Sequence, residues 1–426
     1  MTNNKSPNRR RPTTTHTAST RRSQQQTAPR HGTRAPARKT DIKNSASSMA
    51  QTKNTQSRKM RTIGEMDFTF LTLVIVIVCF GLVMVFSASS PRALRIANDS
   101  FHFVKKQLIF SILGFVMMLV VSRIDYKKYE GYVGVFMIVC LALLAIVLIP
   151  GIGIEHNGSR RWLKLPGFEL QPSELMKPVI AMFIAKIIQQ KSYNPETLGG
   201  ILKIAVWVGI TALLLLLETH VSGAIVICGI AAFVMLAGGV KLRYFLAGAA
   251  VAVPAGLMYL LNDPVRSKRL MVAFNPFLDK RGVGYQAVQG LYSIGSGGLF
   301  GQGLGQSIQK TSFLPEPYND FIFAVICEEL GLLGATIVIV LFCALIFRGI
   351  RIAIHAPDTF STLTVLGIMA HISIQTLFNL CVVTCLIPNT GITLPFFSYG
   401  GTAIIVLLIE MGIVLNISRH AKTNYN

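Results

Sequence analysis

Ten apolar runs, each long enough to cross a lipid bilayer, constrain this chain more than any other feature. A helix needs about 20 mostly apolar residues to cross the hydrocarbon core, and a soluble fold could not bury so many. Only 14% of the 426 residues are charged. We predict an all-α polytopic membrane protein with about ten transmembrane helices. The predicted spans are residues 67–88, 102–121, 130–150, 172–190, 201–217, 221–239, 243–261, 320–347, 360–387 and 399–418.

The segment before the first span is polar and basic. Residues 1–64 contain fifteen Lys or Arg residues against one acid, Asp41. With so few large apolar residues the tail is expected to be disordered. A basic tail beside a membrane span indicates the cytoplasmic side and attraction to anionic lipid, not nucleic-acid binding. We expect a membrane domain over residues 65–420 and a cytoplasmic end over 421–426.

Basic residues in the short connections indicate the orientation. With the tail inside, every inner connection is basic, as the positive-inside rule requires. Both termini are then cytoplasmic, in the plasma membrane, and a large outer loop, residues 262–319, separates spans seven and eight. The outer segments 151–171 and 262–319 also carry Lys and Arg. An anionic ligand at the outer face would explain them, although long loops cross regardless of charge.

The outer segment 151–171 contains Arg160, Arg161 and Trp162 in a row. Two guanidinium groups suit a phosphate or pyrophosphate, and the indole suits the headgroup interface or a sugar face. An interfacial loop leading into a capped helix is the alternative. Further along, Glu218 and His220 lie between two apolar runs. A turn wetted by lipid headgroups is slightly favoured there over a polar pair facing a cavity.

Residues 282–331 combine a glycine-rich half with an acidic half. Glycine at this density lets backbone approach backbone or ligand closely. Glu316 and Asp320 follow, and an acid such as Asp320 is stabilised where a helix begins. Glu328 and Glu329 lie deeper in the next apolar run; acids in such places usually pair with a basic or hydrogen-bonding neighbour.

The last outer segment, residues 388–402, contains Ser398, Tyr399 and three glycines, of which two follow Tyr399 directly. It indicates either close helix packing or a backbone-amide pocket for an anion. The seven cysteines lie in apolar runs without Cys-x-x-Cys spacing, so no metal site is predicted.

Four motifs, in this order, resemble the SEDS family of shape, elongation, division and sporulation proteins, and most closely its FtsW/SpoVE branch. The resemblance covers about residues 65–418 but not the tail. The motifs are SRRWLKLPGFELQPSELMK, GYQAVQGLYSIGSGGLFGQGLGQS, LPEPYNDFIFAVICEELG and PNTGITLPFFSYGGTA.

The resemblance implies a peptidoglycan glycosyltransferase that polymerises lipid II into β-1,4 glycan strands at the outer membrane face, in division or sporulation. The family's essential acid matches Asp320, the candidate general base of an inverting transfer. Arg160, Arg161 and Lys310 are candidates for neutralising the pyrophosphate. Glu316 would orient a sugar, support Asp320 or have a purely structural role. Trp162, Ser398 and Tyr399 complete the expected set of substrate-binding residues.

The implied partners are lipid II, a class B penicillin-binding protein, other division proteins and membrane lipid. A divalent cation could share the charge neutralisation, although no dedicated ligand set is evident. Two other functions use the same residues: a lipid II flippase without glycosyl transfer, and a scaffold that recruits a penicillin-binding protein. A flippase would tolerate loss of a base at Asp320, and a scaffold would tolerate loss of the arginines as well.

Overall fold

The computed structural model describes residues 64–156, 159–262 and 275–421, with positions 267, 268, 270 and 272 between them. The predicted basic tail lies, apart from Gly64, outside the described residues. Of the predicted cytoplasmic end, 421–426, only Ala421 is described.

Every predicted span coincides with a helix in the described part of the chain. Seven of these helices, α2, α3, α4, α6, α12, α13 and α14, are long and apolar enough to cross a membrane. Helices α7 and α8 provide shorter apolar stretches, and α5 carries Glu174, Lys177 and Lys186. The all-α polytopic architecture is confirmed, and ten crossings remains a prediction. The helices are α2 (Phe68–Ala97), α3 (His102–Arg123), α4 (Tyr126–Val147), α5 (Pro172–Gln189), α6 (Leu198–Leu217), α7 (Val221–Ala237), α8 (Leu242–Leu261), α12 (Ile322–Ile354), α13 (Thr359–Val383) and α14 (Gly401–His420).

Local signals start several of these helices. The Asp67 carboxylate accepts a hydrogen bond from the Phe70 amide, 2.9 Å away, and caps α2. Asp358 and Ser361 form a capping box at the start of α13. Pro172 occupies the first turn of α5, where its missing N–H costs nothing.

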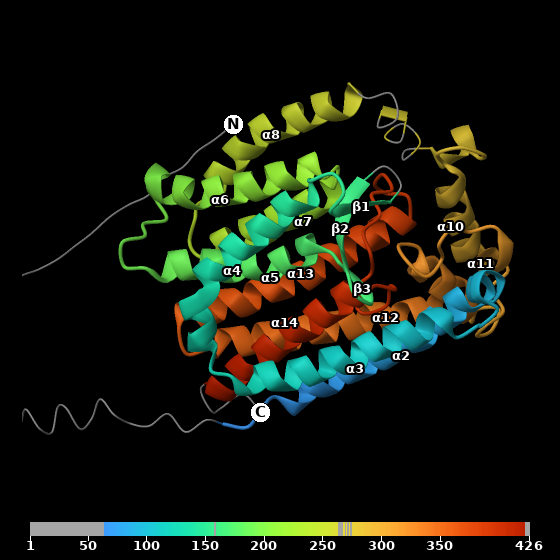
Figure 1. Ribbon diagram of the computed structural model, residues 1–426, viewed down its shortest axis with the longest axis horizontal. Coiled ribbons are helices and arrows are strands. Elements are labelled where there is room, and N and C mark those ends of the chain that lie inside the picture. Colours follow the sequence, from blue (N-terminus) through green and yellow to red (C-terminus); the bar gives the residue numbers. More distant parts are fainter. Residues whose placement is uncertain are drawn as a thin grey trace, which may run out of the picture. The chain divides into compact units, whose positions relative to one another are not determined.

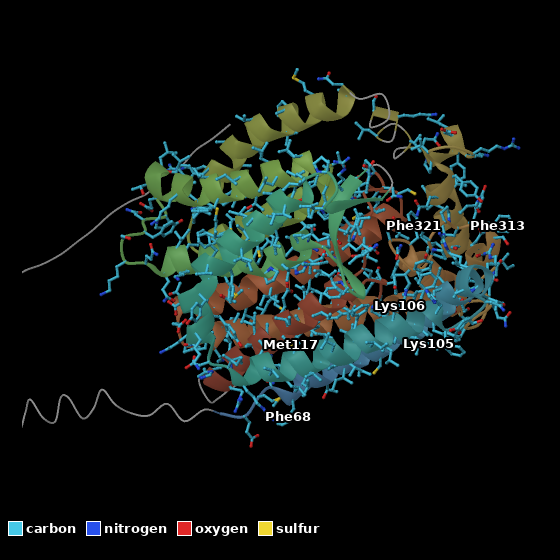
Figure 2. The ribbon with its side chains drawn as sticks, viewed as in Figure 1. Phe68, Lys105, Lys106, Met117, Phe313 and Phe321 are labelled. Carbon is cyan, nitrogen blue, oxygen red and sulfur yellow. The ribbon has the colours of Figure 1, made fainter. Side chains whose placement is uncertain are left out.

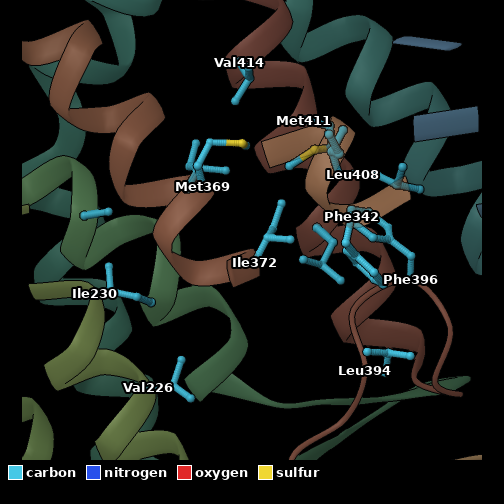
Figure 3. Packing of buried hydrophobic residues seen from close by; sticks show 14 of the residues in the cluster. Val226, Ile230, Phe342, Met369, Ile372, Leu394, Phe396, Leu408, Met411 and Val414 are labelled. Atoms are coloured by element: carbon cyan, nitrogen blue, oxygen red, sulfur yellow. The ribbon is translucent and has the colours of Figure 1, made fainter. Parts of the chain in front are cut away.

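Helices α13 and α14 form the interior of the bundle. Of the most apolar stretch of α14, 78% is buried, against 17% of that of α6, whose remaining surface is available to lipid. Figure 3 shows side chains of α12, α13 and α14, among them Phe342, Ile372 and Met411, gathered in the interior. Helix α14 packs mainly on α3, and Gly412 permits this because a Cβ there would lie 2.6 Å from the Met118 carbonyl oxygen.

The longer connecting segments, which contain the strands and the short helices, fold toward one end of the bundle (Figure 1). They include a three-stranded antiparallel sheet of strands β1 (Gly153–His156), β2 (Ser159–Leu165) and β3 (Phe168–Leu170), in the order β1-β2-β3. They also include η1 (Pro276–Asp279), α10 (Tyr285–Ser296) and α11 (Gln309–Ser312). The all-α prediction did not anticipate the sheet.

The glycine-rich segment packs backbone against backbone. Gly331 has non-helical angles inside α12, with φ 67°, and a Cβ there would lie 2.4 Å from the Gly301 nitrogen. At this contact the amides of Gln302 and Gly303 donate to the carbonyls of Glu328 and Glu329, at 2.9 and 3.0 Å. Glycine is required because no side chain fits between the two segments.

Candidate active site

A cavity of about 810 Å³ opens between the sheet and the ends of α3, α5, α7 and α14. Its remaining wall comes from the segment that precedes α12 and from residues 391–403. Segments far apart in sequence therefore meet in one site at the end of the bundle where the connecting segments lie (Figure 1).

Asp320 lies in the wall of this cavity, two residues before α12 begins. Hydrogen bonds to the backbone hold its segment in place. The Asn379 amide donates to the Asp320 carbonyl at 2.8 Å, the Ser398 hydroxyl donates to the Asn319 carbonyl at 2.6 Å, and the Tyr399 N–H donates to the Tyr318 carbonyl at 2.9 Å. The backbone is thus fixed while the Asp320 carboxylate faces the cavity.

The Asp320 carboxylate itself is sparsely bonded. Its side-chain contact with the Gln286 amide is 3.5 Å long, at the limit of a hydrogen bond. The pKa of Asp320 is raised to about 6, mainly by burial and in smaller part by the negative charge of Glu316. Hydrogen bonds from its own backbone and from Gln286 lower the same pKa. An acid in this state is largely ionised at neutral pH yet basic enough to accept a proton.

Four cationic side chains share the cavity with Asp320: Lys106, Arg161, Lys164 and Lys177. The Lys177 ammonium lies 2.7 Å from Glu174 and 2.8 Å from Gln375, both buried, so its charge is balanced. Lys106 and Lys164 are exposed, and within the described residues neither has an ion-pair partner. The cavity therefore presents positive charge to an anion.

Arg161 connects the sheet to the turn between α6 and α7. Its guanidinium donates to the Thr219 carbonyl at 2.6 Å and to the Ser159 hydroxyl at 3.1 Å. Its neighbour Arg160 pairs instead with Glu155, 3.2 Å away on β1, and does not line the cavity.

Three other predicted site residues line the cavity: Trp162, Glu316 and Tyr399. The Glu316 carboxylate accepts from the Asn319 amide at 2.9 Å and lies 3.8 Å from Arg92. Its backbone has φ 45°, a left-handed conformation that costs energy in a residue with a side chain. The Pro-Glu-Pro corner therefore holds Glu316 in a strained position at the cavity wall.

Two predicted residues lie elsewhere. Ser398 is 7% exposed and bonds the backbone of Leu394 and Asn319, which positions the Asp320 segment. Lys310, on α11 (Gln309–Ser312), is 3% exposed and bonds Ser87 and Glu329. Their direct contact with substrate remains a prediction.

The turn at Glu218 and His220 is buried, so the expectation of a wetted turn is wrong. His220 lines the cavity and is 7% exposed, and Glu218 is 1% exposed. Neither Glu218 carboxylate oxygen has a hydrogen-bond partner among the described residues. Burial raises the pKa of Glu218 to about 8, against the opposing charge of Arg161, and burial lowers the pKa of His220.

Sequence reasoning missed Lys106, Gln286 and Asn379. Asn379 carried a signal, because an amide inside an apolar run needs a buried partner. Lys106 lies within the second predicted span, four residues after its start. In the described part of the chain no three His, Cys, Asp or Glu side chains are grouped as metal ligands.

The fold and the site together define a class of protein: a multi-pass membrane protein with a carboxylate and several cations in a cavity at one end of its helix bundle. The chain belongs to the FtsW/RodA/SpoVE family of cell cycle proteins, whose model matches residues 67–423.

Individual relatives match nearly their full length. Stage V sporulation protein E of Bacillus subtilis is 39% identical over 84% of this chain and 98% of its own. The probable peptidoglycan glycosyltransferase FtsW of Geobacter sulfurreducens is 40% identical over 85% of this chain and 98% of its own.

Two solved structures share the fold. A chain from a study of how a peptidoglycan synthase complex coordinates polymerization and crosslinking aligns with TM-score 0.71 and 26% identity, over 84% of this chain and 99% of its own. The rod shape determining protein RodA of Thermus thermophilus aligns with TM-score 0.63 and 26% identity, over 84% of this chain and 98% of its own.

Proposed function

We propose that the protein is a peptidoglycan glycosyltransferase that polymerises lipid II into β-1,4 glycan strands, in division or sporulation. One observation carries the proposal: Asp320, a sparsely bonded carboxylate, lies in a cavity that also holds Lys106, Arg161 and Lys164. Relatives 35–40% identical bear the name probable peptidoglycan glycosyltransferase FtsW. The cavity faces the outer side of the membrane, and both termini are cytoplasmic.

The reaction joins two lipid-linked sugars. A hydroxyl of the acceptor sugar attacks the anomeric carbon of the donor, and undecaprenyl pyrophosphate leaves. Because the donor bond is α and the product is β-1,4, one inverting displacement suffices. Asp320 accepts the proton of the attacking hydroxyl, a contribution of roughly 10²–10⁴ in rate.

The leaving pyrophosphate needs compensating charge, not a proton. Arg161, Lys106 and Lys164 supply that charge from fixed elements, β2 and α3. Preorganised charge of this kind stabilises the transition state without rearranging during the reaction. Trp162 and Tyr399 supply aromatic surface in the same cavity for the sugars.

The proposed partner is a class B penicillin-binding protein, which would crosslink the strands, within a larger group of division proteins. The related chain from a peptidoglycan synthase complex, aligned at TM-score 0.71, supports this arrangement.

The test is glycan synthesis from labelled lipid II by the purified protein, alone and with its class B partner carrying an inactive transpeptidase site. We expect polymer from the unmodified protein and none from Asp320→Asn, because an amide cannot accept the proton. Asp99→Asn is the matched control. Asp99 pairs with Lys105 at 2.8 Å outside the cavity, and an exposed pair contributes little to stability.

Other outcomes would distinguish a different catalytic base, a flippase and a scaffold. Equal polymer from Asp320→Asn would move the base elsewhere, with Glu316 next in line. Lipid II transport across vesicles by both proteins, with no polymer from either, would indicate a flippase. Neither polymer nor transport, together with partner binding, would indicate a scaffold.

A further inference from the structure

A second cavity, of about 390 Å³, lies on the other side of the segment that carries Asp320. The segment forms a wall between the two cavities. Pro315 and Pro317 line the second cavity, while Glu316, Asn319 and Asp320 line the first.

The second cavity also presents paired cations. Arg92 and Arg95 line it from α2, three residues apart and so on one helix face. Arg92 lies 3.8 Å from Glu316 and over the Tyr318 ring at 5.9 Å, with its side chain 37% exposed. Arg95 donates to the Pro91 carbonyl at 3.4 Å and to the Thr311 carbonyl. Two guanidinium groups at this spacing suit a diphosphate.

Exposed apolar side chains adjoin these arginines. Ile96 is 64% exposed and Phe313 is 47% exposed, and both line the cavity. Figure 2 labels Phe313 and Lys106, from the second and first cavities, both toward the end of the bundle near α10 and α11. Cations beside exposed apolar surface suit an anion carried on a hydrocarbon chain.

Glu316 links the cavities. Its carboxylate lines the first cavity and reaches Arg92 of the second, and its backbone is held at φ 45° between two prolines. A ligand that draws Arg92 away from Glu316 would therefore change the charge four residues from Asp320.

We propose that the second cavity binds a prenyl diphosphate, the anchor of the second lipid-linked substrate, so that donor and acceptor lie on either side of the Leu314–Asp320 wall. The inference rests on the proposed function, because only a polymerase of lipid-linked sugars needs two such anchors at once. Asp320 then belongs to the one segment, Leu314–Asp320, that borders both binding sites.

The test counts bound ligands without turnover. The Asp320→Asn protein, in phosphatidylcholine nanodiscs, is titrated with undecaprenyl pyrophosphate, and native mass spectrometry counts the molecules bound. We expect the Asp320→Asn protein, which is the parent of the variants below, to bind two molecules of undecaprenyl pyrophosphate. The Arg92→Gln/Arg95→Gln variant should weaken one of the two sites at least about tenfold. Arg281→Gln, a basic residue of the same outer segment that lines neither cavity, should keep both sites.

Conservative and complementary variants make the result specific. Arg92→Lys/Arg95→Lys keeps the charge but loses the planar fork, so its second site should be intermediate in affinity. Arg161→Gln should weaken the other site instead. A parent that binds one molecule, a glutamine double variant that keeps both, or equal competition by phosphatidylglycerol would overturn the inference. Two binding sites in a protein that makes no polymer would sink the proposed function and leave the second site standing.

Discussion

Asp320 and the pair Glu328–Glu329 are acids of one short segment with opposite surroundings. Asp320 is half-buried at a cavity wall, with one side-chain contact of 3.5 Å. Glu328 and Glu329, on α12, are at most 1% exposed and fully engaged in hydrogen bonds.

The two glutamates fasten α10, α11 and the segment between them to the long helices of the bundle. Glu328 accepts hydrogen bonds from the hydroxyls of Ser293 and Ser307, at 2.8 and 2.6 Å, and from the amides of Ile308 and Gln309, at 2.8 and 3.2 Å.

Glu329 accepts from the Ser87 hydroxyl at 2.6 Å and pairs with Lys310, so it joins α12 to α2 and α11. Carboxylates whose oxygens are all engaged in hydrogen bonds, as in Glu328 and Glu329, hold the surrounding segments in place. The sparsely bonded Asp320 carboxylate keeps lone pairs free to accept a proton from a reacting hydroxyl.

The largest effect is expected when one of the fully hydrogen-bonded glutamates, Glu329, is removed. Glu329→Ala leaves the Lys310 ammonium buried without its counter-charge, which should destabilise the protein by about 3–5 kcal/mol. Thermal unfolding in detergent, followed by intrinsic fluorescence, measures the loss. The Lys310→Met/Glu329→Leu variant removes both charges and should recover most of it. If the single and double variants unfold alike, the buried pair is not what fastens the segment.

The second test uses the pH dependence of polymerisation. The pKa of Asp320, raised to about 6 by burial, separates an active ionised form above pH 6 from an inactive protonated form below it. Activity should therefore be near its plateau at pH 7.5 and fall to about a tenth at pH 5. Initial rates at low lipid II concentration, measured across this range, give the profile.

A neighbouring variant sharpens the pH test. The Glu316 charge raises the pKa of Asp320, so Glu316→Gln should move the midpoint to lower pH while Asp99→Asn leaves it in place. A profile that is flat from pH 5 to 7.5 would assign the proton acceptor to another group.

The sequence predicted the helices well because the bilayer demands long apolar runs. All ten runs coincide with helices, and the span predicted for residues 172–190 matches α5 (Pro172–Gln189). The three-stranded sheet escaped prediction, since its strands are three to seven residues long and lie between two spans.

That missing sheet explains why Arg160 and Arg161 could not be distinguished. Arg160 faces Glu155 across the strand pair β1–β2 and forms an ion pair with it, a contact that needs the strand register. One partner of Lys310 is also distant in sequence, because Ser87 lies 223 residues before it. Asp320, by contrast, could be named because its motif is local.

The smallest effect is expected at Glu218. Its carboxylate has no hydrogen-bond partner among the described residues, and it does not line the cavity. The pKa of Glu218 in the folded protein, about 8, lies above its ordinary value of 4.5. Between these two pH values the folded protein therefore holds a proton that the unfolded chain releases. Stability from this group is complete below pH 4.5 and declines as pH rises toward 8, by about 1.4 kcal/mol per unit. Above pH 6, Asp320 no longer contributes to that slope.

Glu218→Gln imitates the protonated side chain and should flatten the decline between pH 6 and 8. Melting temperatures of the two proteins should then converge at pH 6 and separate at pH 8, with the variant higher. Polymerisation at pH 7 should stay within about twofold, because the group is already neutral there. Glu155→Gln, which alters an exposed acid on β1, should leave the slope unchanged. Equal slopes in the two proteins, with Glu218→Gln melting lower at both pH 6 and pH 8, would show instead that Glu218 is ionised and stabilised by Arg161.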